Sequence, residues 1–291
     1  MALRRVIRYA GAAFAALALI VAAAVGWLKL HEDELVFATA RSKLQAISET
    51  PSGAERVSIP VSDHIALAGL LYTPAPGADT GYFILQLHGN ADSAFSAEQV
   101  RHCRALSSAG YGVLDIDYHG FGLTPGTPSE ARMYEDAEAA LGEILRRGVP
   151  AEHIILLGHS LGSGPAVYVA TRHPAAALVL FGAFTSIPDA AADRYPWLPV
   201  RYAASVQFDS LSRLPKVHMP VIIAHSRADA TIPYLHALRL YAAANEPKRL
   251  LTFDHPSADG FGGHVDTLFE HVDELKSALE ALLPGAQSPG R

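Results

Sequence analysis

Short apolar runs that alternate with helical patterns constrain the fold of this chain most. Six of them begin near residues 81, 111, 153, 176, 220 and 249. Runs of this length, rich in Val, Ile and Leu, are typical of strands buried on both faces. Because helical crossovers join parallel strands, the alternation predicts a mainly parallel sheet with helices on both faces.

Two further strands are expected before the first of these runs. Residues 56–74, RVSIPVSDHIALAGLLYTP, alternate between apolar and polar positions around a turn at Ser62-Asp63-His64. We expect this hairpin to form an antiparallel edge, which gives an α/β fold with eight strands. Helices are predicted from Ser96 to Ala109 and from Ser129 to Arg147, the second opened by the capping pair Ser129 and Glu130.

The N-terminus predicts a membrane anchor over residues 1–30. Three arginines precede the stretch from Tyr9 to Leu28, which contains no charged residue and is long enough to cross a hydrocarbon core of roughly 30 Å. A signal peptide cleaved near Ala22-Ala23-Ala24 is the alternative, and it would leave a secreted or periplasmic protein. In both cases the arginines place the N-terminus in the cytoplasm and the remainder of the chain on the non-cytoplasmic side.

We divide the rest of the chain into three parts, the second of which contains an insertion at 183–220. Residues 31–55 are a polar connector, residues 56–284 form the main domain, and residues 285–291 are a disordered tail. The insertion at 183–220 is too long for an ordinary connection and falls where parallel sheets bind ligands. We expect it to form a small apolar lid over the substrate, made partly by Tyr195, Trp197, Leu198, Tyr202 and Phe208.

A serine stands between glycines where one apolar run ends. Residues 158–162, GHSLG, match the G-x-S-x-G pattern between a predicted strand and a predicted helix. Such a turn exposes the serine hydroxyl above the sheet, and the following helix directs free N–H groups toward the same place. Ser160 is therefore predicted to be a nucleophile.

A serine nucleophile needs a base and a carboxylate, which follow it in the order acid, then histidine. Asp229 lies in the loop after VIIAHS, although it is also placed to be an acidic residue at a helix start, with Thr231 as the cap. His264 ends a glycine-rich loop before the last helix, and we favour it over His255, which directly follows a strand.

The remaining machinery is an oxyanion hole made of two N–H groups. We assign these to Leu161, which follows the nucleophile, and to Asn90 in the loop HGNA. His159 is expected to pack beside the nucleophile and to have no role as its base, because adjacent side chains diverge.

Composition argues against several other functions. A net charge of −6 without blocks of like charge disfavours nucleic acid as a partner. The 14 histidines form no H-E-x-x-H pattern, and Cys103 is the only cysteine. We therefore expect neither a metal nor a cofactor.

Four segments together, LHGNADS, DYHGFGLTPGTPSE, GHSLGSG and FTSI, resemble a known family. They are similar to the membrane-anchored α/β-hydrolases that include monoacylglycerol and lysophosphatidylserine lipases, with acyl-protein thioesterases as neighbours. The resemblance runs from Val57 to Leu282 and implies an α/β-hydrolase fold with Ser160, Asp229 and His264 as triad. His119 departs from it, because such proteins usually carry arginine there.

The combined prediction is a serine hydrolase that cleaves carboxylic esters of acyl lipids, of the monoacylglycerol or lysophospholipid type, through an acyl-enzyme. Its partners would be this hydrophobic substrate and a membrane. An acyl-protein thioesterase or serine peptidase on the same fold is one alternative. A non-catalytic membrane-tethered binding protein is another.

Overall fold

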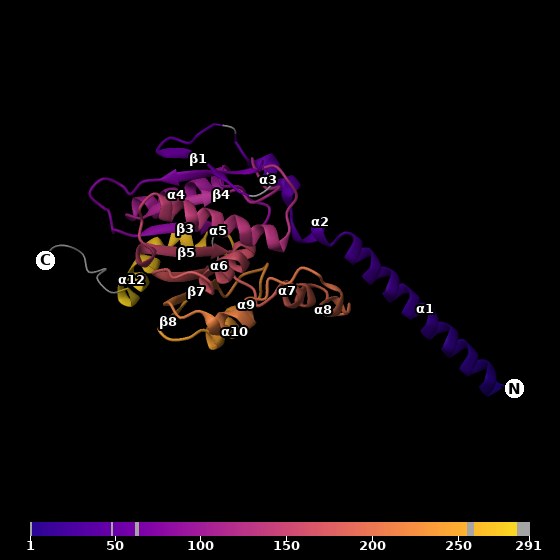
Figure 1. Ribbon diagram of the computed structural model, residues 1–291. Helices are drawn as coiled ribbons and strands as arrows, with labels where there is room; N and C mark the ends of the chain where they lie inside the picture. The colour runs from indigo at the N-terminus through magenta and orange to yellow at the C-terminus, as the bar shows by residue number, and fades with distance from the viewer. Residues whose placement is uncertain (1, 48, 62–63, 255–258, 284–291) are drawn as a thin grey trace.

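One eight-stranded sheet forms the centre of the protein (Figure 1). The computed structural model describes residues 2–47, 49–61, 64–254 and 259–283. The strands are β1 (Ala54–Pro60), β2 (Ala66–Tyr72), β3 (Phe83–Leu87), β4 (Gly112–Ile116), β5 (Ile154–His159), β6 (Ala177–Phe181), β7 (Val221–Ser226) and β8 (Lys248–Phe253). Their order is β1-β2-β4-β3-β5-β6-β7-β8; β1 and β2 pair antiparallel, as do β2 and β4, and all other neighbours are parallel. The predicted α/β architecture with an antiparallel edge is confirmed.

Helices cover both faces of this sheet (Figure 1). They are α4 (Ala97–Ser108), α5 (Glu130–Arg146), α6 (Ser163–Ala170), α10 (Leu235–Ala243), α11 (Thr267–Glu270) and α12 (Val272–Leu282). In β5, Ile154 and Leu156 pack into the core shared with α5, α6 and α10, whereas Ile155 and Leu157 pack into the core shared with α4 and α12. Both faces of the strand are buried, which explains why its sequence is continuously apolar.

The predicted helix starts are also present. The Ser96 hydroxyl accepts the Gln99 N–H at the start of α4, and the Ser129 hydroxyl accepts the Arg132 N–H at the start of α5. Each bond satisfies a backbone donor that has no partner within the helix.

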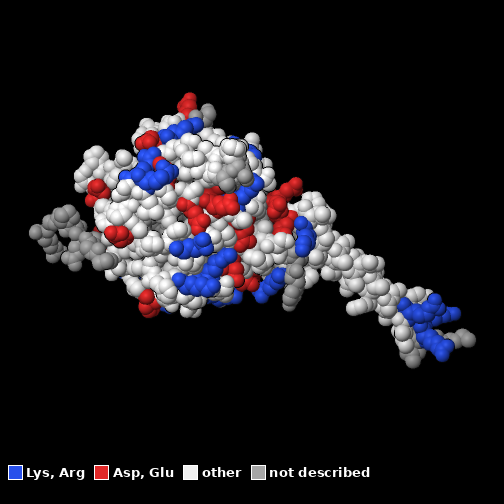
Figure 2. Space-filling view, in the orientation of Figure 1, with Lys and Arg blue, Asp and Glu red and all other residues white. Residues whose placement is uncertain are grey.

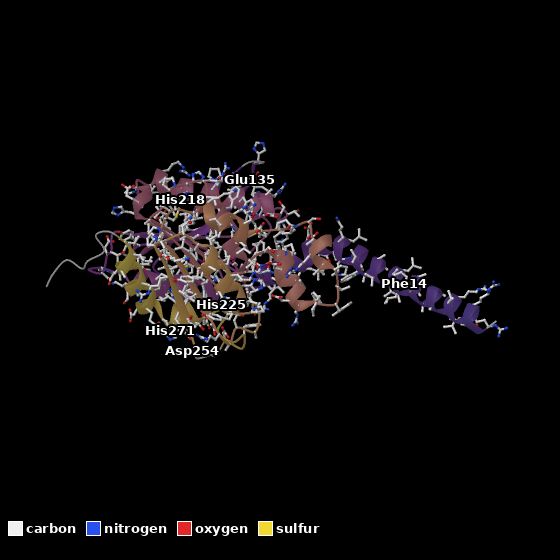
Figure 3. All side chains as sticks on the ribbon, turned by 90° about the horizontal axis from the view of Figure 1, so that it is seen from below. Phe14, Glu135, His218, His225, Asp254 and His271 are labelled. Atoms are coloured by element: carbon white, nitrogen blue, oxygen red, sulfur yellow. The ribbon has the colours of Figure 1, made fainter. Side chains whose placement is uncertain are left out.

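Helix α1 (Ala2–Leu30) projects away from this body (Figure 1). Its segment from Arg4 to Leu30 has 27 residues and a mean hydropathy of 2.2, and its most apolar stretch is entirely unburied. Phe14 lies on it well outside the body (Figure 3), and basic side chains gather at its free end (Figure 2). The helix is long and apolar enough to cross a membrane once, a property that signal sequences share.

The segment after α1 is built into the body. It forms α2 (Glu32–Val36) and α3 (Thr39–Gln45), and Phe37 between them is buried. The Glu32 carboxylate accepts the backbone N–H groups of Ser205 at 2.6 Å and Val206 at 2.9 Å. Residues 31–45, expected to belong to a connector, are therefore an integral layer over one end of the sheet.

The insertion contains three short helices, α7 (Ile187–Arg194), α8 (Val200–Ala203) and α9 (Ser210–Arg213). α8 lies beside the base of α1 and packs on α7, whereas α9 packs on α6. Phe208 is fully buried, and a Cβ on Gly164 of α6 would lie 2.3 Å from its ring. The expectation that Phe208 belongs to a lid is therefore wrong, because Gly164 leaves a space in the core that its ring fills. The tail at 285–291 and the turn residues 62–63 lie outside the described residues.

Candidate active site

Ser160 lies at the sharp turn where β5 meets the short 3₁₀ helix η3 (Ser160–Gly162), which leads into α6. Its φ of +48° is in the left-handed region that residues with a side chain rarely adopt. The two flanking positions, Gly158 and Gly162, have no room for a side chain. A Cβ on Gly158 would lie 2.7 Å from the Gly162 carbonyl oxygen, and a Cβ on Gly162 would lie 2.1 Å from the Leu87 carbonyl oxygen. This strained turn is the geometry of a nucleophile elbow.

Two other side chains converge on Ser160 from distant loops. His264 Nε2 lies 2.9 Å from Ser160 Oγ, and His264 Nδ1 lies 2.7 Å from Asp229 Oδ2. A carboxylate that accepts Nδ1–H leaves the Nε2 lone pair facing the hydroxyl, so the imidazole can remove the serine proton. The structure thus brings together the three residues expected to form a triad. The competing His255 lies outside the described residues.

The two carboxylate oxygens of Asp229 have different partners. Oδ1 accepts the backbone N–H groups of Thr231 and Ile232, both at 2.8 Å, and thereby closes the turn after β7. Oδ2 lies 2.7 Å from His264 Nδ1 and 3.2 Å from His225 Nε2. Burial by itself raises the pKa of Asp229, but hydrogen bonds from both histidines hold this pKa well below its usual range. The residue therefore closes a turn with one oxygen and orients His264, as an ionised group, with the other.

His225, the buried partner of Asp229, is not among the site residues expected from the sequence. It lies inside the body (Figure 3), and its Nε2 is also 2.9 Å from the Ile232 carbonyl oxygen. The Nε2–H group of His225 is thus shared between the Asp229 carboxylate and the Ile232 carbonyl, which belongs to the turn that Asp229 closes. The available signal is a histidine near the end of the apolar run VIIAHS, because a buried imidazole must find a hydrogen-bond partner.

His159, next to the nucleophile, supports the base. Its Nε2 lies 2.9 Å from the His264 carbonyl oxygen, and its ring stacks on Phe181. Burial, together with the neighbouring His264, lowers the pKa of His159 to about 3, so its ring is neutral at physiological pH. A Cβ on Gly89 would lie 3.1 Å from this ring, which explains the glycine in the facing loop.

The expected oxyanion residues Asn90 and Leu161 both border the same cavity as Ser160. Leu161 is the second residue of the helical turn η3, which continues into α6, so its N–H belongs to the free donors of a helix start. The Asn90 side chain is held from two sides: its Oδ1 accepts the Ala38 N–H and its Nδ2 donates to the Val36 carbonyl, both at 2.8 Å. The N-terminal segment therefore fixes the loop that carries Asn90.

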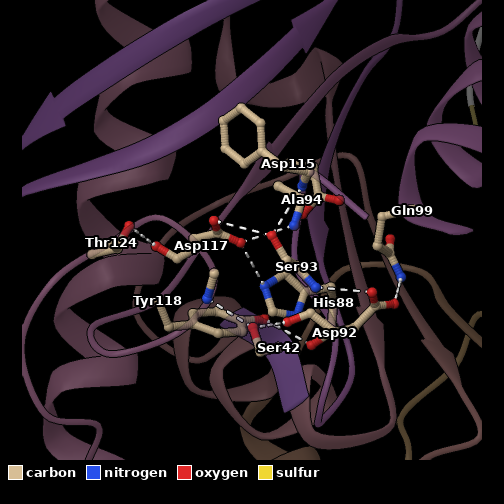
Figure 4. A network of polar contacts seen from close by, with 12 residues as sticks. Ser42, His88, Asp92, Ser93, Ala94, Gln99, Asp115, Asp117, Tyr118 and Thr124 are labelled. Atoms are coloured by element: carbon tan, nitrogen blue, oxygen red, sulfur yellow. Dashed lines mark hydrogen bonds and ion pairs between the residues drawn. The ribbon is translucent and has the colours of Figure 1, made fainter. Parts of the chain in front are cut away.

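A buried polar network lies beneath this loop (Figure 4). The Asp117 carboxylate accepts the Ala94 N–H at 2.9 Å and the Leu123 N–H at 2.7 Å, and it forms an ion pair with His88 Nε2 at 3.7 Å. Burial lowers the pKa of His88, but the carboxylates of Asp117 and Asp115 outweigh it and raise this pKa to about 9. The pair of His88 and Asp117 ties the end of β3 to the end of β4, just before the oxyanion loop.

Ser160 opens into a mainly apolar cavity of about 560 Å³, which we call the large cavity. Two segments outside the sheet, the N-terminal segment and the insertion at 183–220, form much of its wall. Leu28 and Leu35 belong to the N-terminal segment, whereas Ile187, Tyr195 and Val200 belong to the insertion. A pocket of this size and polarity suits a ligand with a long apolar part.

Only one of the aromatic lid residues borders the large cavity in the part of the chain that is described. Tyr195 lines it, whereas Trp197 is 74% exposed and neither Trp197 nor Leu198 lines it. The side chain of Tyr202 lies outside the described residues. The wall is formed mainly by aliphatic side chains, whereas the lid was expected to be largely aromatic.

His119, where the resemblance leads us to expect arginine, is paired inside the fold. Its Nδ1 lies 2.5 Å from Asp136 Oδ1, and its backbone N–H donates to Asp136 Oδ2 at 2.8 Å. This pair connects the loop after β4 to α5 and does not border the large cavity. Among the described residues, no group of three His, Cys, Asp or Glu side chains has the arrangement of a metal site.

The sheet, the serine on its strained turn and the His–Asp pair in contact with it define a class of protein. The chain is a serine hydrolase on an α/β-hydrolase fold. A solved structure of the esterase Pf2001 from Pyrococcus furiosus shares this fold with a TM-score of 0.62 at 18% identity, over 80% of this chain and 96% of that one.

Sequence comparisons place the chain within a family. Residues 81–208 match the family described as serine aminopeptidase, S33, and the chain belongs to this family. It is 33% identical to an uncharacterized protein of Mycobacterium tuberculosis H37Rv over 237 residues, which are 81% of this chain and 83% of the relative. It is also 32% identical to lysophosphatidylserine lipase ABHD12 of Danio rerio over 185 residues, 57% of this chain and 48% of that protein.

Proposed function

We propose that the protein hydrolyses carboxylic esters of acyl lipids, with Ser160 as nucleophile, His264 as base and Asp229 as its orienting acid. The observation that carries this proposal is the hydrogen-bonded chain from Asp229 through His264 to Ser160, which opens into the large cavity. Its apolar walls match a fatty acyl chain, and the resemblance to lipases of monoacyl lipids points the same way.

The reaction proceeds in two halves. Ser160 Oγ attacks the acyl carbonyl carbon while His264 Nε2 takes its proton, and the N–H groups of Asn90 and Leu161 stabilise the oxyanion. When the carbon–oxygen bond breaks, His264 gives this proton to the departing alcohol. Water then attacks the acyl carbonyl carbon while His264 takes a proton from it. The bond from this carbon to Ser160 Oγ breaks, His264 returns the proton to Oγ, and the fatty acid leaves.

A chain-length series tests this function. We expect kcat/KM for 4-nitrophenyl esters to rise from acetate to laurate, by up to about fourfold for each methylene buried in the large cavity. Ala190→Trp, which narrows this cavity, should flatten the rise, whereas Ala192→Trp, on the same helix but outside the lining, should preserve it. Rates measured with detergent-solubilised full-length protein provide the comparison.

Other results would favour the alternatives. A preference for matched acyl thioesters or for peptide amides would make the protein a thioesterase or a peptidase. Failure of a fluorophosphonate probe to label the intact protein would contradict hydrolase activity altogether and favour a tethered binding protein.

We also propose that α1 spans a membrane, with its three arginines on the cytoplasmic side and the body on the other. The unburied apolar stretch of α1 and the basic side chains at its free end support this arrangement (Figure 2). Leu28, near the end of α1, borders the large cavity. A substrate dissolved in the bilayer would therefore reach Ser160 where α1 leaves the membrane.

The two tryptophans, Trp27 on α1 and Trp197 in the insertion, allow a direct test. In Trp197→Phe, we expect phosphatidylcholine brominated near its headgroups to quench Trp27 fluorescence in reconstituted vesicles, because Trp27 lies at the end of the apolar stretch. In Trp27→Phe, we expect Trp197 to be quenched as well. Trp197 lies three residues before the start of α8, and α8 contacts α1. Unquenched Trp27 would contradict the anchor, and unquenched Trp197 alone would place the insertion away from the bilayer.

A further inference from the structure

One carboxylate, that of Asp259, organises the loop that carries His264. Its Oδ1 accepts the backbone N–H groups of Phe261 at 2.7 Å and Gly263 at 3.0 Å. Its Oδ2 accepts the backbone N–H group of Val265 at 2.9 Å. The carboxylate therefore holds the residue before His264 with one oxygen and the residue after it with the other.

The backbone of this loop is shaped to surround an anion. Gly262 and Gly263 have φ angles of +70° and +84°, in the left-handed region that other residues rarely adopt. Backbone that curls in this way directs several N–H groups toward one point and forms a concave site for negative charge. Because glycine loses more conformational freedom on folding than any other residue, such a loop has little stiffness of its own. Its shape depends on the contacts with Asp259.

The carbonyl groups of the same loop contact the loop that carries the acid. The Phe261 carbonyl accepts the Ala230 N–H at 3.0 Å, and the Gly262 carbonyl accepts the Ser226 hydroxyl at 2.7 Å. A Cβ on Gly262 would lie 1.9 Å from the Ala228 carbonyl oxygen, so the two loops are in direct backbone contact. The shape of one loop thus sets the distance between acid and base.

We propose that Asp259 is a positioning residue for the base. By holding the backbone on both sides of His264, its carboxylate keeps Nε2 of the imidazole 2.9 Å from Ser160 Oγ and Nδ1 2.7 Å from Asp229 Oδ2. A displacement of about 1 Å in such an arrangement can cost about 100-fold in rate. This inference rests on the proposed function and adds to it the residue that keeps the base aligned.

The far end of the loop is fixed by contacts that do not involve the Asp259 carboxylate. Asp266 Oδ1 lies 2.7 Å from His102 Nε2 of α4, and the His264 carbonyl oxygen lies 2.9 Å from His159 Nε2. Loss of the Asp259 carboxylate should therefore leave the loop attached to the body. What it releases is the curl of the backbone that orients the imidazole.

Kinetics of full-length variants test this role. We expect Asp259→Ala to lower kcat for 4-nitrophenyl laurate, and the rate of fluorophosphonate labelling, each by about 100-fold. KM should change by less than about threefold, because both halves of the reaction use the same base and Asp259 is absent from the lining of the large cavity. Asp259→Asn, which keeps one accepting oxygen, should lose about tenfold in kcat.

Asp254→Ala is the matched control. Asp254 lies in the same connection between β8 and α11, but it is exposed and pairs with Arg227 at 2.8 Å. We expect kcat of this variant to change by less than about twofold.

A double substitution separates alignment of the base from a general loss of stability. In Asp229→Asn the base is already misoriented, so adding Asp259→Ala should lower kcat by less than about threefold further. A further loss of about 100-fold in this background would overturn the proposal. Thermal melts accompany each assay, and Asp259→Asn takes the place of the alanine variant if that variant melts below the assay temperature.

Two other results are decisive. An unchanged kcat in Asp259→Ala, or a rise in KM without a fall in kcat, would overturn the proposal while leaving hydrolase activity intact. Absence of both ester hydrolysis and fluorophosphonate labelling in the unmodified protein would overturn this proposal and the proposed function together.

Discussion

Replacing Ser160 with alanine should lower kcat/KM for ester substrates by about a million-fold and abolish labelling by a fluorophosphonate probe. The change removes the only atom proposed to form a covalent bond with the acyl group. Within the described residues, the only side-chain hydrogen bond lost with it is the one from Oγ to His264 Nε2 at 2.9 Å. We therefore expect the variant to fold normally, and a thermal melt beside the activity assay checks this.

Ser163→Ala is the matched control for this variant. Ser163 begins α6 in the same turn, but its hydroxyl donates to the Ser160 carbonyl at 2.6 Å and does not contact His264. It should lose less than about tenfold in kcat/KM, the cost of one supporting hydrogen bond. Persistent probe labelling of Ser160→Ala would show that the nucleophile lies elsewhere.

Asp229→Asn should lower kcat by about ten-thousand-fold with little change in KM. Asparagine keeps the oxygen that accepts the Thr231 and Ile232 N–H groups, so the turn after β7 survives. At the position of Oδ2, however, it presents an amide that donates toward His264 Nδ1. The imidazole then carries its proton on Nε2 and presents no lone pair to Ser160 Oγ.

Steady-state kinetics of full-length Asp229→Asn, alongside Asp254→Asn, measure this effect. Asp254 is an exposed partner of Arg227, and its substitution should leave kcat within about twofold. A loss of less than tenfold in Asp229→Asn would contradict its role as the orienting acid. His225 would also face the amide in this variant, so a moderate loss of stability is expected beside the loss of kcat.

Much of the fold follows from short-range patterns in the sequence. The run at 154–157 is apolar at every position because β5 is buried on both faces, and the spacing of such runs by helices already implies parallel strands. The turn around Ser160 is local in part. Gly158 is dictated by the close approach of Gly162, Ser163 and Ala166 within the same turn, whereas Gly162 is dictated by the Leu87 carbonyl at the end of β3. The G-x-S-x-G pattern nevertheless marks this turn in the sequence, because all its residues lie within five positions.

The surroundings of the site depend on contacts between residues far apart in the chain. Glu32 contacts Ser205, and Asn90 contacts Val36, although nothing in the sequence near either residue indicates the partner. For the same reason residues 31–45 resemble a connector in sequence, and the aromatic residue Phe208 resembles a lid residue although it is part of the core. Polarity alone does not reveal whether a segment packs against the body.

The sequence by itself determined the order of strands and helices, the strained serine and the loops that carry Asp229 and His264, because each depends on local periodicity or on steric demands within one turn. The tertiary structure alone decided that the segment after the N-terminal helix and the insertion together wall the large cavity, and that His225 supports the acid. These relationships arise when packing closes long loops, and no local sequence pattern encodes which distant surfaces then meet.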